Sequence, residues 1–227
     1  MLAENLPPQN RLLAALSQEI YLPLRSKLER FELQLGETVY GPGDKFSHVY
    51  FVESGIIAML AVADGHSSLE VAMVGNEGMV GLPVFLGIRT SGDRAVVQAP
   101  GIALRLKVAD FREECLRFGE LHDVMQKFTY AIIIQFARTA ACNRFHSTEA
   151  RMAKWLMKTQ DRLRTDTFSI TQEFLSYMLG VRREAINKIA RDFQRSELIS
   201  YSRGDFSITD RKGLESIACN CYQPIMN

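Results

Sequence analysis

The sequence has few cysteines, no long apolar run and almost no net charge, and each absence excludes a class of protein. Cys115, Cys142, Cys219 and Cys221 are too few and too scattered for a disulfide framework in 227 residues. The longest uncharged apolar stretch, 128–137, is about half as long as a membrane-spanning helix needs to be. The first residues lack a basic region followed by an apolar run, so we expect no secretory signal. We therefore expect a cytoplasmic protein with no membrane partner.

The charge is balanced overall but uneven along the chain. The 27 basic and 26 acidic side chains give a net charge of +1, so the total charge does not indicate nucleic acid. Residues 147–227 nevertheless hold 13 basic and 10 acidic side chains. The excess is densest between 178 and 204, in Arg182, Arg183, Lys188, Arg191, Arg195 and Arg203. A nucleic-acid surface, if present, is expected in this C-terminal region.

The hydrophobic pattern divides the chain into three parts and indicates the α+β class. Residues 1–108 combine helical spacing in the first 30 residues with short β-rich runs punctuated by Gly, Pro and Asp, which is typical of a β-sandwich or barrel. Residues 109–145 contain no proline and predict one long connecting helix. Residues 146–227 predict a helical domain that ends in a hairpin.

The predicted long helix carries an apolar seam whose members are spaced alternately by four and three residues. The seam consists of Leu121, Met125, Phe128, Ile132, Gln135, Thr139 and Cys142. Such spacing is typical of a coiled coil, although its polar members weaken it from Gln135 onward. We expect the helix both to cover its own β-domain and to meet a second copy of the chain. Packing on its own domain alone stays open as the alternative.

The segment 169–208 predicts a helix-turn-helix followed by a hairpin. Thr171 or Ser169 can cap a first helix, and Gly180 lies where a sharp interhelical turn requires a positive φ. A second helix then places Ala185, Ile186, Ile189 and Phe193 on one side, and it leaves a polar, basic side that starts at Arg182 and Arg183. In this motif the N-terminal end of the second helix enters the major groove of DNA.

The side-chain types on that polar side suit DNA. Arginine can bond guanine through two donors, and glutamate can accept from cytosine. The runs 198–201 and 206–208, joined through Arg203-Gly204-Asp205, predict a hairpin wing whose tip offers Arg203 to a phosphate. An ordinary amphipathic helix pair with a solvated charged face remains the alternative.

The sequence resembles the Crp/Fnr superfamily of bacterial transcription regulators over nearly its whole length. The motif TQEFLSYMLGVRREAINKIARDFQRSELI is similar to the family's helix-turn-helix, GETVYGPGD and HVYFVESG to its sensor strands, and HSTEARMAKWL to its hinge. The resemblance implies a double-stranded β-helix (jelly-roll) sensor, a dimerisation helix and a winged helix-turn-helix. It also implies base contacts at Arg183, Glu184 and Lys188, and phosphate contacts at Thr171, Gln172 and Arg182. The expected partners are a near-palindromic duplex, a second copy of the chain and RNA polymerase.

The family's cyclic-nucleotide pocket is altered in this sequence. Members that bind cyclic nucleotides carry a Gly-Glu pair for the ribose and an Arg-Ser or Arg-Thr pair for the phosphate. Here Gly78-Met79 and Arg94-Ala95 stand at those positions, and Phe136 replaces an adenine-contacting hydroxyl. We expect no cyclic AMP binding, and either an unidentified effector at Gly78, Met79, Arg94, Ala95 and Phe136 or none. A cyclic-nucleotide-responsive activator is the alternative.

Catalytic, cofactor and metal sites are not expected. No Cys precedes position 115, which excludes the family's N-terminal iron–sulfur cluster, and the four histidines are dispersed. Cys219 and Cys221 would lie on opposite faces of an extended tail and cannot bind zinc by themselves. A ligand-binding module whose helix-turn-helix contacts proteins, and a cupin-type metal enzyme, remain the alternative functions.

Overall fold

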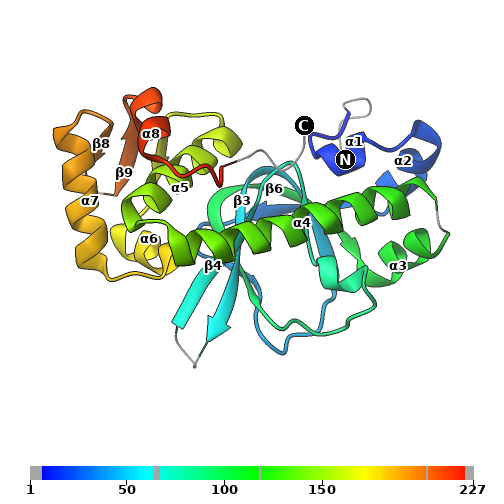
Figure 1. Cartoon of the computed structure of the whole chain (residues 1–227). Coiled ribbons are helices and arrows are strands. Elements are labelled where there is room, and N and C mark those ends of the chain that lie inside the picture. Colours follow the sequence, from blue (N-terminus) through cyan, green and yellow to red (C-terminus); the bar gives the residue numbers. More distant parts are fainter. Residues whose placement is uncertain (1–6, 64–66, 118, 203, 223–227) are drawn as a thin grey trace. The chain divides into compact units, whose positions relative to one another are not determined.

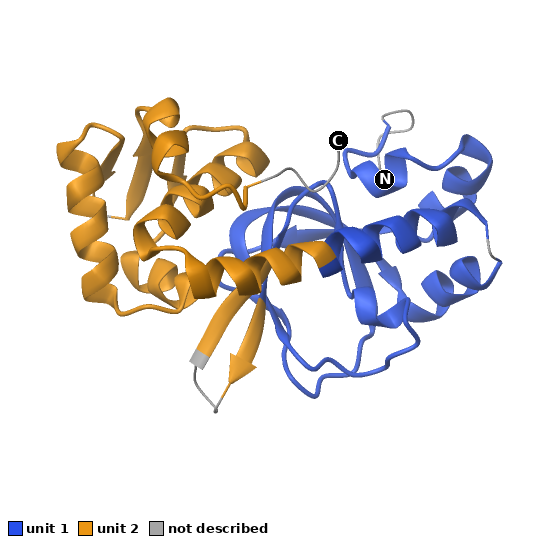
Figure 2. Cartoon of the chain, viewed as in Figure 1, with its two compact units in different colours: residues 1–59, 73–133, 226 blue, residues 60–72, 134–225, 227 orange. Residues whose placement is uncertain are grey.

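The structure is a computed structural model that describes residues 7–63, 67–117, 119–202 and 204–222 (Figure 1). It divides into a first unit, within residues 1–59 and 73–133, and a second unit, within residues 60–72 and 134–225 (Figure 2). Among the described residues, no helix combines the length and the apolar character that crossing a membrane requires. The mixture of helices with antiparallel strands confirms the predicted α+β class.

The first unit is built on a sheet with the strand order β1-β6-β3-β4, to which β2 adds beside β6 and β5 beside β3. Strands β1 and β2 pair with β6 in antiparallel orientation, and β5 pairs with β3 in the same way. The strands are β1 (Glu29–Leu33), β2 (Thr38–Tyr40), β3 (His48–Ala63), β4 (Ser67–Val74), β5 (Met79–Val80) and β6 (Arg94–Lys107). The predicted β-rich region is confirmed.

Strands β3 and β6 approach each other so closely that one position must be glycine. Gly55 has a φ of +81°, and a Cβ built on it would lie 2.7 Å from the carbonyl oxygens of Ala99 and Pro100. Any side chain would therefore push the two backbones apart, in addition to the cost of the left-handed conformation. The close approach lets β3 fill the core along its length, where Phe51, Ile56 and Ile57 are fully buried.

Short helices flank this sheet, and a buried asparagine holds the first of them in place. The helices of the first unit are α1 (Arg11–Ala14), α2 (Gln18–Arg25), the 3-10 helix η1 (Leu82–Val84) and α3 (Val108–Leu116). The Oδ1 of Asn10 accepts from the backbone of Leu12 and Leu13, which caps α1. Its Nδ2 donates to the carbonyl oxygens of Val52 at 2.8 Å and Gly78 at 2.7 Å, so the cap is tied to the sheet.

The prediction of one helix over 109–145 is wrong, because the structure has two. Helix α3 ends at Leu116, and α4 (Glu120–Phe145) begins after Gly119. Glycine costs a helix interior about 1 kcal/mol relative to alanine, so the break falls where the sequence is weakest. The proposed domain boundaries at 108 and 146 stay predictions.

The apolar seam predicted on the long helix faces the interior of the chain. Leu121, Met125, Phe128 and Ile132 are at most 2% exposed, and Gln135 and Cys142 are also buried. We call this set the inner seam. The opposite face carries a second set spaced alternately by four and three, the outer seam, which is exposed and consists of Gln126, Tyr130, Ile133, Ala137, Ala140 and Arg144. Burial of the inner seam agrees with the expectation that this helix covers its own chain. The expected contact of the same helix with a second copy cannot use these buried side chains and stays a prediction.

Besides the end of α4 and the parts of β3 and β4 within residues 60–72, the described part of the second unit contains three strands and four helices. They are α5 (Thr148–Leu163), β7 (Thr167–Ser169), α6 (Gln172–Leu179), α7 (Arg183–Arg195), β8 (Ile199–Ser202), β9 (Asp205–Ile208) and α8 (Arg211–Ile217). The strands pair antiparallel in the order β7-β9-β8. Trp155, Leu175, Phe193 and Phe206 are at most 2% exposed and form the centre of its core.

Candidate nucleic-acid interface

Helix α6 is the first helix of the predicted helix-turn-helix. The hydroxyl of Thr171 accepts from the backbone N–H of Phe174 at 3.1 Å, so Thr171 is the N-cap. Leu175, Met178 and Leu179 are buried, which fixes the helix on the domain core. The predicted cap and apolar face are confirmed.

The turn between the two helices depends on Gly180. Its φ is +61°, and the N–H of Val181 bonds the carbonyl of Ser176 at 3.1 Å, so the helix ends in a left-handed cap. A Cβ built on Gly180 would lie 2.7 Å from the Cδ1 of Leu69. Glycine is therefore required here both by the backbone conformation and by a neighbouring side chain.

Helix α7 presents the predicted basic face to solvent. Ile186, Ala190 and Phe193 are at most 1% exposed and hold its other side on the core. Arg183, Glu184 and Lys188 are exposed at or near the N-terminal end. The helix has 13 residues, so it is about 20 Å long, which suits a major groove.

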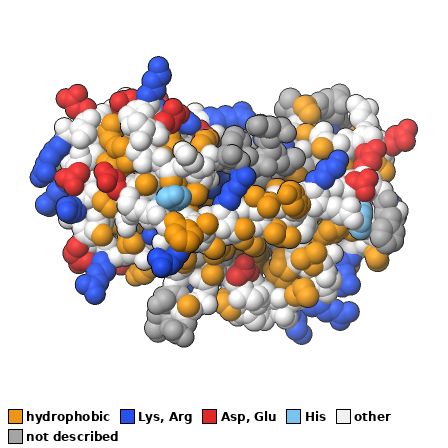
Figure 3. All heavy atoms as spheres, in the orientation of Figure 1, with side chains coloured by type: hydrophobic (Ala, Val, Ile, Leu, Met, Phe, Trp, Pro, Cys, Tyr) orange, Lys and Arg blue, Asp and Glu red, His pale blue; other side chains and the backbone are white. Residues whose placement is uncertain are grey.

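The side chains at this end of α7 have free donor and acceptor groups. In the described part of the chain, the side chains of Arg183, Glu184 and Lys188 make no hydrogen bond or ion pair. At the opposite end, by contrast, Arg195 pairs with Asp192 at 3.2 Å. Lys and Arg side chains are visible along the edge of the second unit that α7 forms (Figure 3). This end of the helix can therefore bond a ligand without first breaking contacts within the protein.

The remaining predicted contacts lie at the starts of the two helices and in the wing. Thr171 is the N-cap of α6, Gln172 is its first residue, and Arg182 is the exposed N-cap of α7. Strands β8 and β9 form the predicted hairpin wing. Arg203, predicted to contact a phosphate, lies outside the described residues.

The wing is tied to α7 and to β7. The Nε2 of Gln194 donates to the carbonyl of Tyr201 at 3.2 Å, and the hydroxyl of Ser169 donates to Asp205 at 2.5 Å. The rings of Tyr201 and Phe206 lie 4.3 Å apart between centroids. The wing and α7 thus form one surface with a fixed relative placement.

Leu69 and Glu70 of β4 lie against helices of the second unit, a contact that the sequence did not predict. Residues 60–72 belong to the second unit. The indole Nε1 of Trp155 donates to the Oε2 of Glu70 at 3.0 Å. Burial raises the pKa of Glu70 to about 7, although the hydrogen bond from Trp155 and the charges of Lys158, Arg162 and Lys154 act in the opposite direction. No local sequence signal marks this contact, because it joins residues 85 positions apart.

Three of the five predicted effector residues occupy strands of the first unit, and the other two, Gly78 and Phe136, do not. Met79 pairs with Phe51 and is 1% exposed, and Ala95 pairs with Tyr40 and is fully buried. Arg94, half-buried, begins β6. Phe136 lies in the second unit, half-buried on α4.

The ring of Phe128 closely covers Gly78. A Cβ built on Gly78 would lie 2.7 Å from that ring, so no larger residue fits without movement. Two cavities in the first unit, of about 200 and 380 Å³, are lined by other residues. The first lies beside His122, Phe111 and Cys115, and the second beside Leu13, Tyr21 and Arg25.

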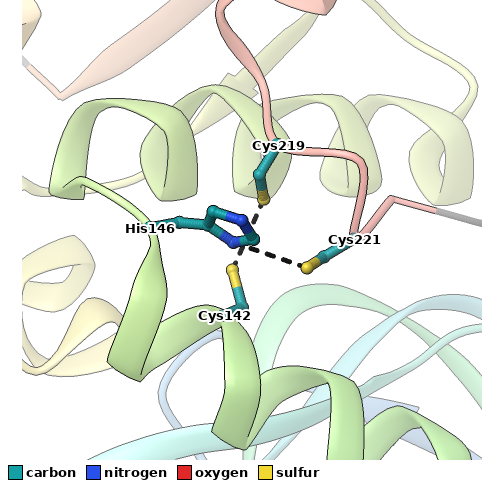
Figure 4. Close-up of side chains that lie close together, drawn as sticks. All are labelled: Cys142, His146, Cys219 and Cys221. Atoms are coloured by element: carbon teal, nitrogen blue, oxygen red, sulfur yellow. Dashed lines mark hydrogen bonds between the residues drawn. The ribbon is translucent and has the colours of Figure 1, made fainter.

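Cys219 and Cys221, which cannot bind zinc by themselves, have two further potential ligand residues beside them in the structure. The structure brings Cys142 and His146 to both cysteines, with all four ligand atoms within 4.8 Å of one another (Figure 4). The spacing of Cys142 and His146, four residues apart at the end of the predicted helix, was the signal in the sequence that the two could share a face.

Two protein-family models match this chain, one for each of its predicted domains. Residues 150–217 match the model of the Crp-like helix-turn-helix domain, and residues 30–118 match that of the cyclic nucleotide-binding domain. The chain belongs to the Crp/Fnr family of transcription regulators. The predicted sensor fold and winged helix-turn-helix are thereby confirmed.

The matches between this Crp/Fnr regulator and individual relatives cover most of this chain and most of each relative. A CRP-like cAMP-activated global transcriptional regulator from Mycobacterium tuberculosis is 25% identical over 209 residues, which cover 84% of this chain and 88% of that protein. FixK2 from Bradyrhizobium japonicum has a TM-score of 0.72 at 13% identity, covering 85% of this chain and 98% of its own. The c-di-GMP responsive regulator CLP from Xanthomonas campestris has a TM-score of 0.68 at 14% identity, covering 85% and 99%. The two solved structures show a shared fold.

Proposed function

We propose that this Crp/Fnr regulator is a homodimer that binds a near-palindromic DNA operator through the N-terminal end of α7. The observation that carries the proposal is the exposed, unengaged set of Arg183, Glu184 and Lys188 on a helix whose other side is buried. These three side chains are assigned to base edges. Thr171, Gln172 and Arg182 are assigned to phosphates, because they lie at helix starts, where the backbone of a duplex would pass. Arg203, which falls between β8 and β9 in the sequence, is also assigned to a phosphate.

The outer seam of α4 is assigned to the contact with the second copy. Its central members are strongly exposed, Tyr130 at 68% and Ile133 at 55%, and near its end Phe145 is 75% exposed. Exposing large apolar side chains on one helix face to water costs free energy, and such side chains commonly form helix–helix interfaces. Two recognition helices related by the two-fold axis would then reach major grooves about 34 Å apart.

We assign no cyclic AMP site to the sensor domain. The cassette offers Arg94 but neither the carboxylate for the ribose nor the hydroxyl beside the phosphate, since Met79 and Ala95 stand in those places and are buried. The named relatives differ among themselves, one being cAMP-activated and another c-di-GMP responsive, so the fold alone selects no effector. An effector, if one acts, is a different molecule. RNA polymerase is the further partner that membership of this family suggests.

The first test measures DNA binding by the Arg183→Ala variant. A guanidinium that bonds a base through two donors contributes about 1–3 kcal/mol of discrimination, so affinity for the preferred operator should fall about 5- to 150-fold. Affinity for random DNA should change little. The operator comes from selection on genomic fragments, and affinity is measured by fluorescence anisotropy at several salt concentrations.

Arg195→Ala is the matched control for that test. It removes the same charge from the same helix, but at the C-terminal end, where Arg195 is paired with Asp192. The control should leave the discrimination intact. Equal weakening on both DNAs by Arg183→Ala would show that Arg183 does not read bases. Absence of salt-dependent binding to any fragment would favour a helix-turn-helix that contacts proteins.

The second test is a calorimetric titration with cyclic AMP. We expect no saturable heat, because a buried Met79 and Ala95 cannot supply the missing carboxylate and hydroxyl. Saturable binding at micromolar concentration that Arg94→Ala abolishes would establish the cyclic-nucleotide-responsive alternative.

A further inference from the structure

Four side chains with metal-binding atoms meet at the end of α4. Cys142 and His146 come from its last turn and the residue after it, and Cys219 and Cys221 come from the segment that follows α8 (Figure 4). The Sγ atoms of Cys142 and Cys219 are 3.4 Å apart, and the Sγ of Cys221 is 3.5 Å from the Nδ1 of His146. All four ligand atoms lie within 4.8 Å of one another.

The local backbone explains why the four atoms converge. The N–H of His146 bonds the carbonyl of Cys142 at 3.1 Å, which continues the helical hydrogen-bond pattern one residue past α4, so the two side chains share a face. Helix α8 ends at Ile217, and the N–H of Tyr222 then bonds the carbonyl of Cys219 at 3.3 Å. This bond closes a turn over Asn220 and Cys221. The turn directs both sulfurs to one side, whereas an extended tail would separate them.

The segment that carries the two cysteines is held on the domain by other contacts. The hydroxyl of Tyr222 bonds Asp161 of α5, and Asp161 also pairs with Arg211 of α8 at 2.6 Å. Cys219 is 9% exposed, so it is docked and not a loose terminal thiol. The cluster therefore exists at a fixed place in the second unit.

We propose that Cys142, His146, Cys219 and Cys221 bind one Zn²⁺ ion in a tetrahedral site of three thiolates and one imidazole. This ligand set is one that structural zinc sites use. Zinc–sulfur bonds of about 2.3 Å hold tetrahedral sulfurs roughly 3.8 Å apart, which is close to the 3.4 Å between Cys142 and Cys219. The set contains no oxygen ligand, which excludes the hard cations Mg²⁺ and Ca²⁺.

The surroundings supply the second shell that such a site needs. Three thiolates and Zn²⁺ leave one negative charge. The ammonium of Lys154 lies 2.8 Å from the Sγ of Cys142, where it donates to the sulfur and balances that charge. Lys154 comes from α5, so the site draws on a third helix.

The metal would join the segments that meet at the start of the DNA-binding domain. His146 lies between the end of α4 and Ser147, which caps α5. One ion thus connects the end of α4 directly to the segment after α8, which is more than 70 residues away in sequence. Because the unfolded chain does not hold these ligands together, the binding free energy stabilises the folded domain. The site is independent of the proposed DNA binding, and its test uses no DNA.

Two other uses of the cluster predict different observations. A disulfide between Cys142 and Cys219 would use two of the four groups and leave Cys221 and His146 without a role. A four-iron cluster attaches each ligand to a different iron, which requires ligand atoms more widely spaced than these. Either observation would overturn the proposal.

The experiment measures metal in the full-length protein, purified with a reductant and without chelator. Elemental mass spectrometry should find about one zinc per chain. Replacement by Co²⁺ should give the intense visible absorption of tetrahedral, thiolate-bound cobalt. Cys221→Ser and His146→Gln, at the least buried ligands, should each lower the zinc content and change the cobalt spectrum. Cys115→Ala, a cysteine on α3 outside the cluster, should change neither.

The possible results of this experiment distinguish the zinc site from its alternatives. Stoichiometric zinc with the thiolate cobalt spectrum in the unmutated protein supports the site even if a variant fails to fold. The proposal is overturned if the purified protein holds no zinc, holds iron, or has a Cys142–Cys219 disulfide. It is also overturned if both ligand variants keep their zinc.

Discussion

Replacing Glu70 by glutamine should make the stability of the protein less dependent on pH. Glu70 is half-buried on β4 and accepts a hydrogen bond from Trp155 at 3.0 Å. Its pKa is raised from 4.5 to about 7, so the folded protein binds more protons than the unfolded chain between these values. The contribution of Glu70 to stability is therefore greatest below pH 4.5 and is lost as the pH rises through about 7.

The size of the effect follows from the gap between the two pKa values. Each pKa unit corresponds to about 1.4 kcal/mol, so the gap sets an upper bound of about 3 kcal/mol. We expect about 1–3 kcal/mol, because the half-buried carboxylate retains some contact with water. Glutamine resembles the protonated carboxyl group at every pH. Glu70→Gln should therefore gain stability over the unmutated protein as the pH rises from 4.5 to above 7.

The assay is urea denaturation of both proteins at a series of pH values, with the difference in the free energy of unfolding plotted against pH. Trp155→Phe removes the hydrogen bond that favours the carboxylate, so it should move the transition to higher pH. A difference that is constant with pH, or that shrinks as the pH rises, would refute the reasoning. Either result would mean that the hairpin does not hold Glu70 out of water.

Two further predictions concern the turn and the dimer. Gly180→Ala should cost about 1–2 kcal/mol in thermal or urea denaturation, because φ is +61° there. Part of that cost comes from the new Cβ, which would lie 2.7 Å from the Cδ1 of Leu69, so adding Leu69→Ala should restore that part of the free energy of unfolding. If the second change restores nothing, the whole cost comes from the backbone conformation. Ile133→Glu should raise the dimer dissociation constant by about tenfold or more in analytical ultracentrifugation, because it places two charges in the proposed interface. An unchanged constant would exclude the outer seam as the dimer contact.

The helix-turn-helix was determined by the sequence itself, because its signals are local. The cap at Thr171, the glycine at 180 and the buried set led by Ile186 and Phe193 each act within a few residues of chain. The β-rich sensor was recognisable for the same reason, since alternation and turn residues are read over short segments. The resemblance to the Crp/Fnr family added the residue roles on α7, which periodicity alone does not assign.

The tertiary structure decided which apolar face is buried and which distant residues meet. Local spacing identified a seam on the long helix, but the chain itself covers that seam, and Tyr130 and Ile133 on the opposite face are left exposed. Trp155 meets Glu70 across 85 positions, and Cys142 meets Cys219 across 77. Such pairs leave no periodic trace, because their proximity results from the packing of whole elements against one another and not from the conformation of a single segment.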